Sequence, residues 1–247
     1  MRTHPAAATF EAGKRPARSV RRIAMCVAAF TLVAGSAVVP VRGASSEFSN
    51  PVVRLFSRAE LPLHQYRAYR RMHASSENAK YEAWLEAWTE LKDGRFNYEI
   101  VAEKGSEAVR GRVLRAMLAR EQEIVNNGDG DKGDLTTANY EFVEGGRDTD
   151  GTRVVNIKPK RNDVMLVDGR AVLDSGGDLL RVEGRLAKNP SFWTSLVNIV
   201  RRYARIGGVR VPVATETTAK VKFVGSAQLE VLYDYQSVNG RTVSSPK

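Results

Sequence analysis

Residues 207–240 read GGVRVPVATETTAKVKFVGSAQLEVLYDYQSVNG, and this stretch decides the fold class of the chain. Apolar or small residues recur at every second position, and charged or amide side chains fill many of the positions between them. A period of two is typical of a strand with one dry and one wet face. The sequence therefore predicts a long β-hairpin that turns near Gly225, with a dry face that needs a cover.

Basic residues are concentrated at the N-terminus. The first 43 residues hold seven of the 38 basic and one of the 28 acidic residues, which leaves 31 and 27, a net charge of +4. Arg21-Arg22 precedes the apolar run IAMCVAAFTLVAGSAVVPV (23–41), and small residues follow at 43–46. This order is typical of a signal peptide. We expect residues 1–43 to direct export to the periplasm and to be cleaved.

Two alternatives for the leader stay open. The apolar run is close to the length that spans a membrane, so an uncleaved anchor is possible, although Gly35, Ser36 and Pro40 dilute it. The paired arginines fit the twin-arginine export signal loosely, and the general secretory route is the other candidate. Cys26 is the only cysteine, so cleavage would leave no thiol for a disulfide, a thiolate nucleophile or a metal site.

Turn signals divide the rest of the chain into short β-rich runs. We expect a lead-in at 44–63, one domain at 64–241 and a tail at 242–247. Asp93-Gly94 predicts a tight hairpin, and further hairpins are expected within 140–159, 162–174 and 175–186. Residues 79–91 fit a helix by the spacing of Trp84 and Trp88, but their alternation and the following turn favour a strand. About ten strands joined by short turns make an antiparallel meander.

One segment, GSEAVRGRVLRAMLAREQEIVNNGDG (105–130), breaks the β rhythm. Ser106 suits an N-cap, Asn127-Gly128 suits a helix end, and the apolar residues recur at steps of three and four. The segment predicts an amphipathic helix of about 18 residues, hence about 27 Å long. Ten strands would make a sheet roughly 48 Å wide. One helix cannot cover that surface if the sheet is flat.

The difference in size between the predicted helix and the predicted sheet favours a mainly β (α+β) fold. In this fold a curled antiparallel sheet, a half-barrel, is wrapped around one long amphipathic helix. Its interior would suit an apolar ligand. The predicted cavity-lining residues come from the helix and the last hairpin: Val109, Val113, Met117, Val211, Val213, Val221, Phe223, Leu229, Val231 and Tyr233. The alternative is that these residues fill a core of their own and no cavity exists.

The C-terminal part, FWTSLVNIVRRYARIGGVRVPVATETTAKVKFVGSAQLEVLYDYQSVNG (192–240), resembles proteins of the LolA/LolB superfamily, the periplasmic lipoprotein carriers. The resemblance extends over about 65–240 as an order of elements, without a short diagnostic motif, so no functional residue is carried over. It implies a half-barrel that shields acyl chains from water, and proteins of this fold also serve as envelope-stress sensors. The single helix departs from the several helical pieces of the carriers.

Other chemistry finds little support. GDGDKGD (128–134) has calcium-loop spacing at two aspartates but lacks the required Gly and Glu, so we expect a solvated loop and no metal or other cofactor. No nucleophile elbow or phosphate-binding glycine loop occurs, and glycine in RVEGRL is expected to mark a turn.

Arg201, Arg202 and Arg205 lie near aromatic residues. Export argues against nucleic acid, so we expect them to contact anionic lipid headgroups or an acidic partner. The alternative is that they form a charged outer face without a partner.

The sequence thus predicts an exported, non-enzymatic binder or carrier of a lipid or an acylated lipoprotein, with a transient membrane contact and a possible envelope protein partner. The first alternative is a ligand-free interaction or stress-sensing module of the same fold. A hydrolase with an unrecognised site is a weaker one.

Overall fold

The computed structural model describes residues 51–57, 60–77 and 80–243. The predicted signal peptide lies outside the described residues. The strands form one 11-stranded sheet. Their bounds are β1 Tyr66–Ser76, β2 Glu82–Lys92, β3 Arg95–Gly105, β4 Tyr140–Arg147, β5 Arg153–Pro159, β6 Val167–Leu173, β7 Leu179–Leu186, β8 Thr194–Ile206, β9 Val209–Val221, β10 Gly225–Val238 and β11 Arg241–Thr242.

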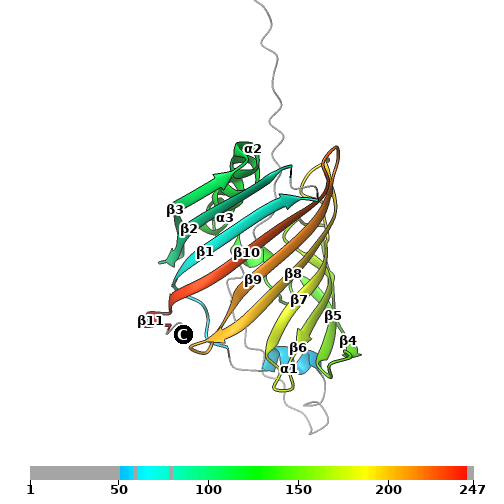
Figure 1. Cartoon of the computed structure of the whole chain (residues 1–247). Helices are drawn as coiled ribbons and strands as arrows, with labels where there is room; N and C mark the ends of the chain where they lie inside the picture. Colours follow the sequence, from blue (N-terminus) through cyan, green and yellow to red (C-terminus); the bar gives the residue numbers. More distant parts are fainter. Residues whose placement is uncertain (1–50, 58–59, 78–79, 244–247) are drawn as a thin grey trace, which may run out of the picture.

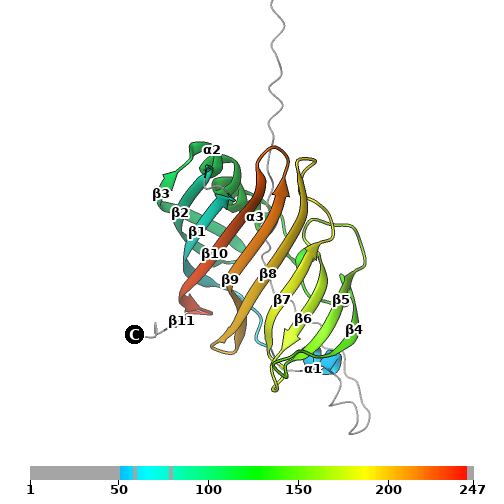
Figure 2. The same ribbon diagram turned by 45° about the vertical axis from the view of Figure 1, so that its right-hand side comes forward.

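The sheet joins two meanders. Its order is β3-β2-β1-β10-β9-β8-β7-β6-β5-β4, with β11 beside β10, and each pairing is antiparallel. The non-consecutive pairing is β1 with β10, where Met72 lies opposite Val231. The sheet curls strongly, yet β3 and β4 end the order on opposite sides and do not pair (Figures 1 and 2). The predicted half-barrel is confirmed: an antiparallel sheet that curls without closing into a barrel.

A helical connection carries the chain from the β3 edge to the β4 edge, along the concave side (Figure 1). It comprises α2 Glu107–Val109, the π-helical segment η2 Arg110–Arg115 and α3 Ala116–Asn126. The long helix is confirmed. Ser106 takes the N-cap position, as expected, but its side chain makes no capping hydrogen bond. The far end is held instead by Asn126, whose Oδ1 accepts from the Phe96 N–H (2.8 Å) and whose Nδ2 donates to the Phe96 carbonyl (3.2 Å).

The predicted lead-in contains a short helix, α1 Pro51–Ser57, that alternation-based reasoning missed. Its Leu55 is buried, and its Phe56 ring meets Phe142 of β4 edge-on at 4.8 Å. Proline suits the first turn of a helix because its missing N–H would have no partner there. None of the helices in the described part of the chain is both long and apolar enough to cross a membrane.

Within the ambiguous segment 79–91, residues 82–91 belong to the strand β2, as the alternation favoured, and residue 79 lies outside the described residues. Its apolar positions face inward while Trp84 and Trp88 lie on the outer face. Asp93 and Gly94 have φ of 52° and 71°, as a tight hairpin of the primed type needs.

The hairpins expected inside 162–174 and 175–186 are wrong. Gly169 and Gly184 lie within β6 and β7 and face each other across the pair. A Cβ built on Gly169 would stand 2.1 Å from the Glu183 carbonyl oxygen. These glycines therefore permit a close backbone approach and mark no turn.

The inner face of the sheet carries two apolar cores. The first lies under η2 and α3 and joins them to β1, β2, β3, β9 and β10. The second joins β5, β6, β7 and β8 to α1, Ile124 and Tyr140. The helix therefore covers one half of the concave face, and the chain that follows it, together with α1, covers the other.

Candidate functional site

The helix and the last hairpin meet on the concave face, as the sequence analysis expected. Most of the residues proposed to line a cavity pack against one another in the first core: Val109, Val113, Met117, Val211, Val213, Leu229, Val231 and Tyr233. Helix positions 109, 113 and 117 share one face because each is four residues from the next. Strand positions 211, 213, 229, 231 and 233 share one face because alternate residues point to the same side.

The two proposed residues at the turn lie elsewhere. Val221 ends β9, is buried, and borders an open groove of about 570 Å³ at this end of the sheet. Phe223 is 94 % exposed and has a φ of 67°, so its placement on the dry face is wrong. The physical reason is that β9 ends at Val221. Beyond that residue the backbone turns, and the period of two no longer fixes where a side chain points.

A buried ion pair joins the helix to the sheet, and the sequence analysis did not find it. Arg70 of β1 and Glu121 of α3 are each 2 % exposed. Arg70 donates through Nη1 to Glu121 Oε2 (2.5 Å) and through Nη2 to Glu121 Oε1 (2.8 Å). The same Nη2 donates to the Tyr66 hydroxyl (2.8 Å). This two-point geometry is the strongest form of an arginine–carboxylate pair.

Aromatic rings enclose the guanidinium of Arg70. Its Cζ lies 4.7 Å from the centroid of Tyr233 and 5.2 Å from that of Phe96, within range of cation–π attraction. Burial raises the pKa of the neighbouring Tyr66, and burial also raises the pKa of Tyr235 well above its ordinary value. Both phenols therefore stay protonated over a wide pH range. The ion pair lies in surroundings from which water is largely excluded.

A signal for this pair exists in the sequence. Tyr66, Ala68, Arg70 and Met72 alternate along one strand, so Arg70 falls on the dry face. Glu121 follows Val113 and Met117 at steps of four, so it falls on the apolar stripe of the helix. A charged residue of each sign on two predicted dry faces indicates a buried pair, because a lone buried charge is strongly unfavourable.

Partly exposed ion pairs hold the first half of the helix. Arg115 donates to Glu103 of β3 (Nη2 to Oε2, 2.6 Å) and to Glu107 (Nη1 to Oε1, 2.9 Å). The hydrogen bond from Arg115 holds the pKa of Glu103 below its usual value. The helix is thus attached by apolar contacts, one buried ion pair and a rim of solvated ion pairs.

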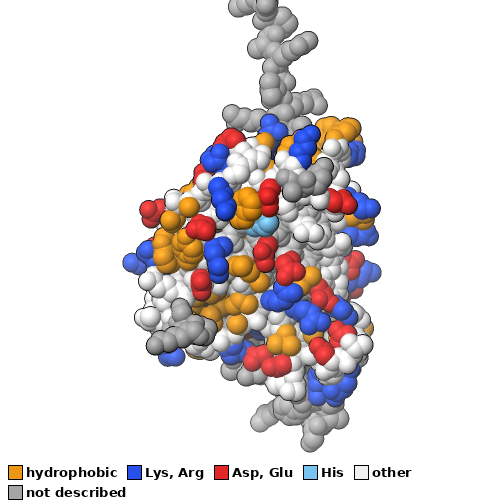
Figure 3. Space-filling model, in the orientation of Figure 1, with side chains coloured by type: hydrophobic (Ala, Val, Ile, Leu, Met, Phe, Trp, Pro, Cys, Tyr) orange, Lys and Arg blue, Asp and Glu red, His pale blue; other side chains and the backbone are white. Residues whose placement is uncertain are grey.

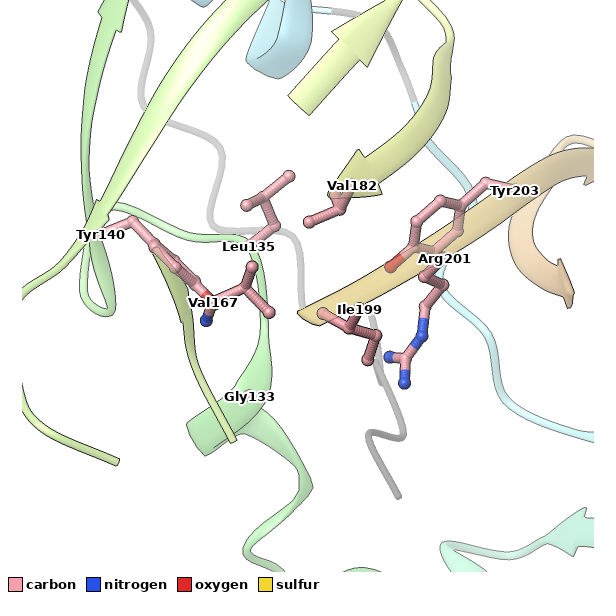
Figure 4. Close-up of a pocket in the computed structure, with 8 residues that line it drawn as sticks. All are labelled: Gly133, Leu135, Tyr140, Val167, Val182, Ile199, Arg201 and Tyr203. Carbon is pink, nitrogen blue, oxygen red and sulfur yellow. The ribbon is translucent and has the colours of Figure 1, made fainter. Parts of the chain in front are cut away.

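A pocket of about 20 Å³ lies in the second core, lined by Gly133, Leu135, Tyr140, Val167, Val182, Ile199, Arg201 and Tyr203. Figure 4 shows the aliphatic side chains gathered between the rings of Tyr140 and Tyr203. Burial raises the pKa of Tyr140 to about 12. This volume accommodates about one water molecule and no acyl chain.

The structure does not bring the three arginines proposed for headgroup contact together. Arg201 is buried, and its Nε donates to Thr215 Oγ1 (3.3 Å). Arg202 is on the opposite, outer face, where it pairs with Glu216. Arg205 lies near the C-terminal end of β8 and pairs with Asp178 (2.6 Å). Alternation along β8 separates Arg201 from Arg202, so the three do not form one basic surface.

The aspartate-rich loop is more buried than expected. Residues 130–133 form a 3-10 turn, η3 Gly130–Gly133, and Asp134 is 3 % exposed. Asn139 donates to the carbonyls of Asp131 (2.9 Å) and Asp134 (2.8 Å). The loop is therefore solvated at Asp131 and Lys132, as expected, and buried at Gly130, Gly133 and Asp134. Among the described residues, no three His, Cys, Asp or Glu side chains gather closely enough to hold a metal ion.

Comparison with known proteins gives structural neighbours only. No protein-family model and no curated protein sequence matches the chain. A domain named for outer membrane lipoprotein sorting from Vibrio parahaemolyticus is 12% identical, with a TM-score of 0.40 over 81% of this chain and 94% of that chain. A LolA superfamily protein from Nitrosomonas europaea is 11% identical, with a TM-score of 0.35 over 79% and 95%.

A DUF1329 family protein from Desulfovibrio piger is 11% identical, with a TM-score of 0.29 over 80% of this chain and 94% of that chain. The structural neighbours thus include the superfamily that residues 192–240 resemble. At these identities and TM-scores, no ligand, partner or role follows from the similarities.

Proposed function

We propose that this protein is an exported, non-enzymatic binder or carrier of an apolar moiety, a lipid or the acyl chains of a lipoprotein, and that the structure is its closed state. The proposed binding surface is the part of the concave face that η2 and α3 now cover. The periplasm is the compartment that the predicted signal peptide implies.

The observation that carries this proposal is the composition of that interface. Around the buried Arg70–Glu121 pair, the helix offers Val113 and Met117, and the sheet offers aliphatic and small residues such as Ala68, Leu85 and Val211. An acyl chain could replace the helix on such a surface with little loss, since each buried methylene contributes about 0.8 kcal/mol. Breaking the ion pair is then the main cost of opening.

The helix has a second property that suits displacement. Its segment Arg110–Arg115 is π-helical, and π turns in helices occur frequently at functional sites. The connection also carries the chain between the two free sheet edges, so it can lift without breaking any strand pairing. The ligand would then lie between the lifted helix and β1, β2, β9 and β10.

The test compares three forms of the chain: the natural sequence, Glu121→Gln and Glu123→Gln. Glu121→Gln keeps the side-chain shape but removes the charge that pairs with the buried Arg70, whereas Glu123 pairs with Arg120 at the surface. We expect Glu121→Gln to bind a fluorescent fatty acid more tightly and to retain more lipid in native mass spectrometry. The Glu123→Gln control should match the natural sequence. Failure of all three to take up fatty acid would contradict the proposal.

A specific observation favours the ligand-free envelope module as a second candidate. The pocket in the second core is only about 20 Å³, and eight of the ten proposed lining residues already pack against one another in the first core. On this alternative Glu121→Gln lowers the free energy of unfolding and changes nothing else. The same experiment therefore separates the two functions.

A further inference from the structure

An exposed aromatic cluster stands at one end of the sheet, where the β9–β10 turn meets the segment before β8. We call Phe192, Trp193, Lys222 and Phe223 the aromatic tip. Trp193 lies 5.6 Å from Phe192 and 5.9 Å from Phe223 between ring centroids. The Lys222 N–H donates to the Trp193 carbonyl (2.9 Å), which ties the two segments together. The Lys222 Nζ lies 3.7 Å from the Phe192 ring centroid.

The two phenylalanine rings of the aromatic tip face water, and Trp193 between them is partly buried. Phe223 is 94 % exposed, Phe192 is 77 % exposed, and the nearby Leu196 is 44 % exposed. Figure 3 shows hydrophobic side chains gathered at the corner where Figure 1 places the β9–β10 turn, with Lys or Arg side chains beside them. Single exposed apolar residues are ordinary, but a contiguous group of large ones marks an interaction surface.

The backbone presents this group at a conformational cost. Phe223 has a φ of 67° and Leu196 has a φ of 49°, in the left-handed region that favours glycine and asparagine. A turn with glycine at position 223 would form more easily, so the folded state alone gives no reason for a phenylalanine there. Strained positions of this kind concentrate at functional sites.

The chemistry of the aromatic tip favours a lipid bilayer over a protein groove. The cluster lies on a projecting turn, and it combines large rings with a lysine, the mixture that is favoured at the membrane–water interface. The adjoining open groove adds Lys220 beside Lys222, with Glu77 as its acidic residue. Lysines around an apolar tip complement the phosphates of anionic lipids.

We propose that the aromatic tip inserts among the headgroups of an anionic bilayer and docks this end of the half-barrel on the membrane. The contact therefore lies at Phe192, Trp193, Lys222 and Phe223 and not at the arginines of β8. A membrane-docked module without cargo would use this contact equally, so the inference is independent of the proposed function.

The test measures the fluorescence emission of Trp193. The tryptophans are Trp84, Trp88 and Trp193, so Trp84→Phe/Trp88→Phe leaves Trp193 as the single emitter in the full chain. We expect vesicles of phosphatidylglycerol and phosphatidylethanolamine to shift its emission to the blue, and brominated acyl chains to quench it. Vesicles of phosphatidylcholine alone should act weakly, and high salt should reduce binding. Vesicle binding without quenching of Trp193 would overturn the proposal, because another surface would then make the contact.

A pair of variants separates docking from folding. Phe223→Gly removes the ring and relieves the backbone, so we expect a higher melting temperature together with a vesicle affinity reduced about tenfold. The matched control is Val143→Ser, which removes an apolar residue that is 62 % exposed on the edge strand β4. It should leave vesicle binding unchanged. Equal vesicle binding by Phe223→Gly, or a tip that instead captures a soluble envelope protein without binding vesicles, would refute the membrane contact.

Discussion

Arg70 and Glu121 form a two-point ion pair between the sheet and the helix, with both side chains 2 % exposed. Arg70 lies on β1, the third strand counted from the β3 edge of the sheet, and Glu121 lies in the last turns of the helix that leaves that edge. The pair therefore fixes where the helix rests on the concave face. An apolar interface alone specifies such a position less well, because aliphatic contacts have little directionality.

Replacing one partner of this ion pair should lower the free energy of unfolding more than replacing both partners. Arg70→Met or Glu121→Leu leaves an unpaired buried charge, and we expect each to lower the free energy of unfolding by about 3–5 kcal/mol. The double variant should be destabilised less than either single one, because no buried charge remains. Urea unfolding followed by circular dichroism measures all three. Additive losses would contradict a direct coupling.

Acid should loosen the first half of the helix through Glu103. Its pKa lies below the ordinary value in the folded state because Arg115 donates to it. A lowered folded pKa contributes stability above the unfolded value, about pH 4.3, and that contribution is lost as the pH falls through the folded pKa. We expect Glu103→Gln to flatten the acid side of the stability profile. Glu99→Gln, an exposed change on the same strand, should leave the slope as it is.

Gly169 should tolerate no side chain. Its Cβ would lie 2.1 Å from a backbone oxygen of the paired strand, so Gly169→Ala must push β6 and β7 apart. We expect a loss of at least about 2 kcal/mol, in the range of severe overpacking. Gly111→Ala is the control, since its Cβ would have only one neighbour, at 3.8 Å. That change should stabilise the helix by about 0.5–1 kcal/mol. Similar thermal shifts for the two variants would show that the close approach of β6 and β7 does not constrain position 169.

The amide of Asn126 should anchor the end of the helix to β3. It exchanges two hydrogen bonds with the backbone of Phe96, at 2.8 Å and 3.2 Å. Asn126→Ala removes both, and we expect a loss of about 1–2 kcal/mol. Hydrogen exchange of the Phe96 amide should accelerate with it. Asn127→Ala, at the next exposed position, should change neither quantity.

Local pattern predicted the elements of this protein well. Alternation from Val209 to Val221 and from Leu229 to Tyr235 identified the long hairpin, and steps of three and four identified the helix. Asp93-Gly94 identified a turn because few residue pairs accept two positive φ values. Such features depend on near neighbours in the chain, so the sequence carries them directly.

The sequence pattern failed to predict features that depend on residues far away in the chain or on where a strand ends. Asp168-Gly169 reads as a turn, but the opposite strand places Gly184 against it and keeps β6 straight. Phe223 continues the dry alternation, but the strand ends before it. Local pattern also did not predict the π segment Arg110–Arg115 or the absence of a capping hydrogen bond from the Ser106 side chain.

The sequence by itself determined that the chain forms an antiparallel, curled sheet with one amphipathic helix too short to cover it. The tertiary structure alone decided that β1 pairs with β10, that Arg70 meets Glu121, and that aromatic rings from two segments gather at one exposed corner. The reason is that periodicity assigns a face to each residue. Which faces meet depends on the pairing of strands far apart in the chain, and periodicity carries no information about that pairing.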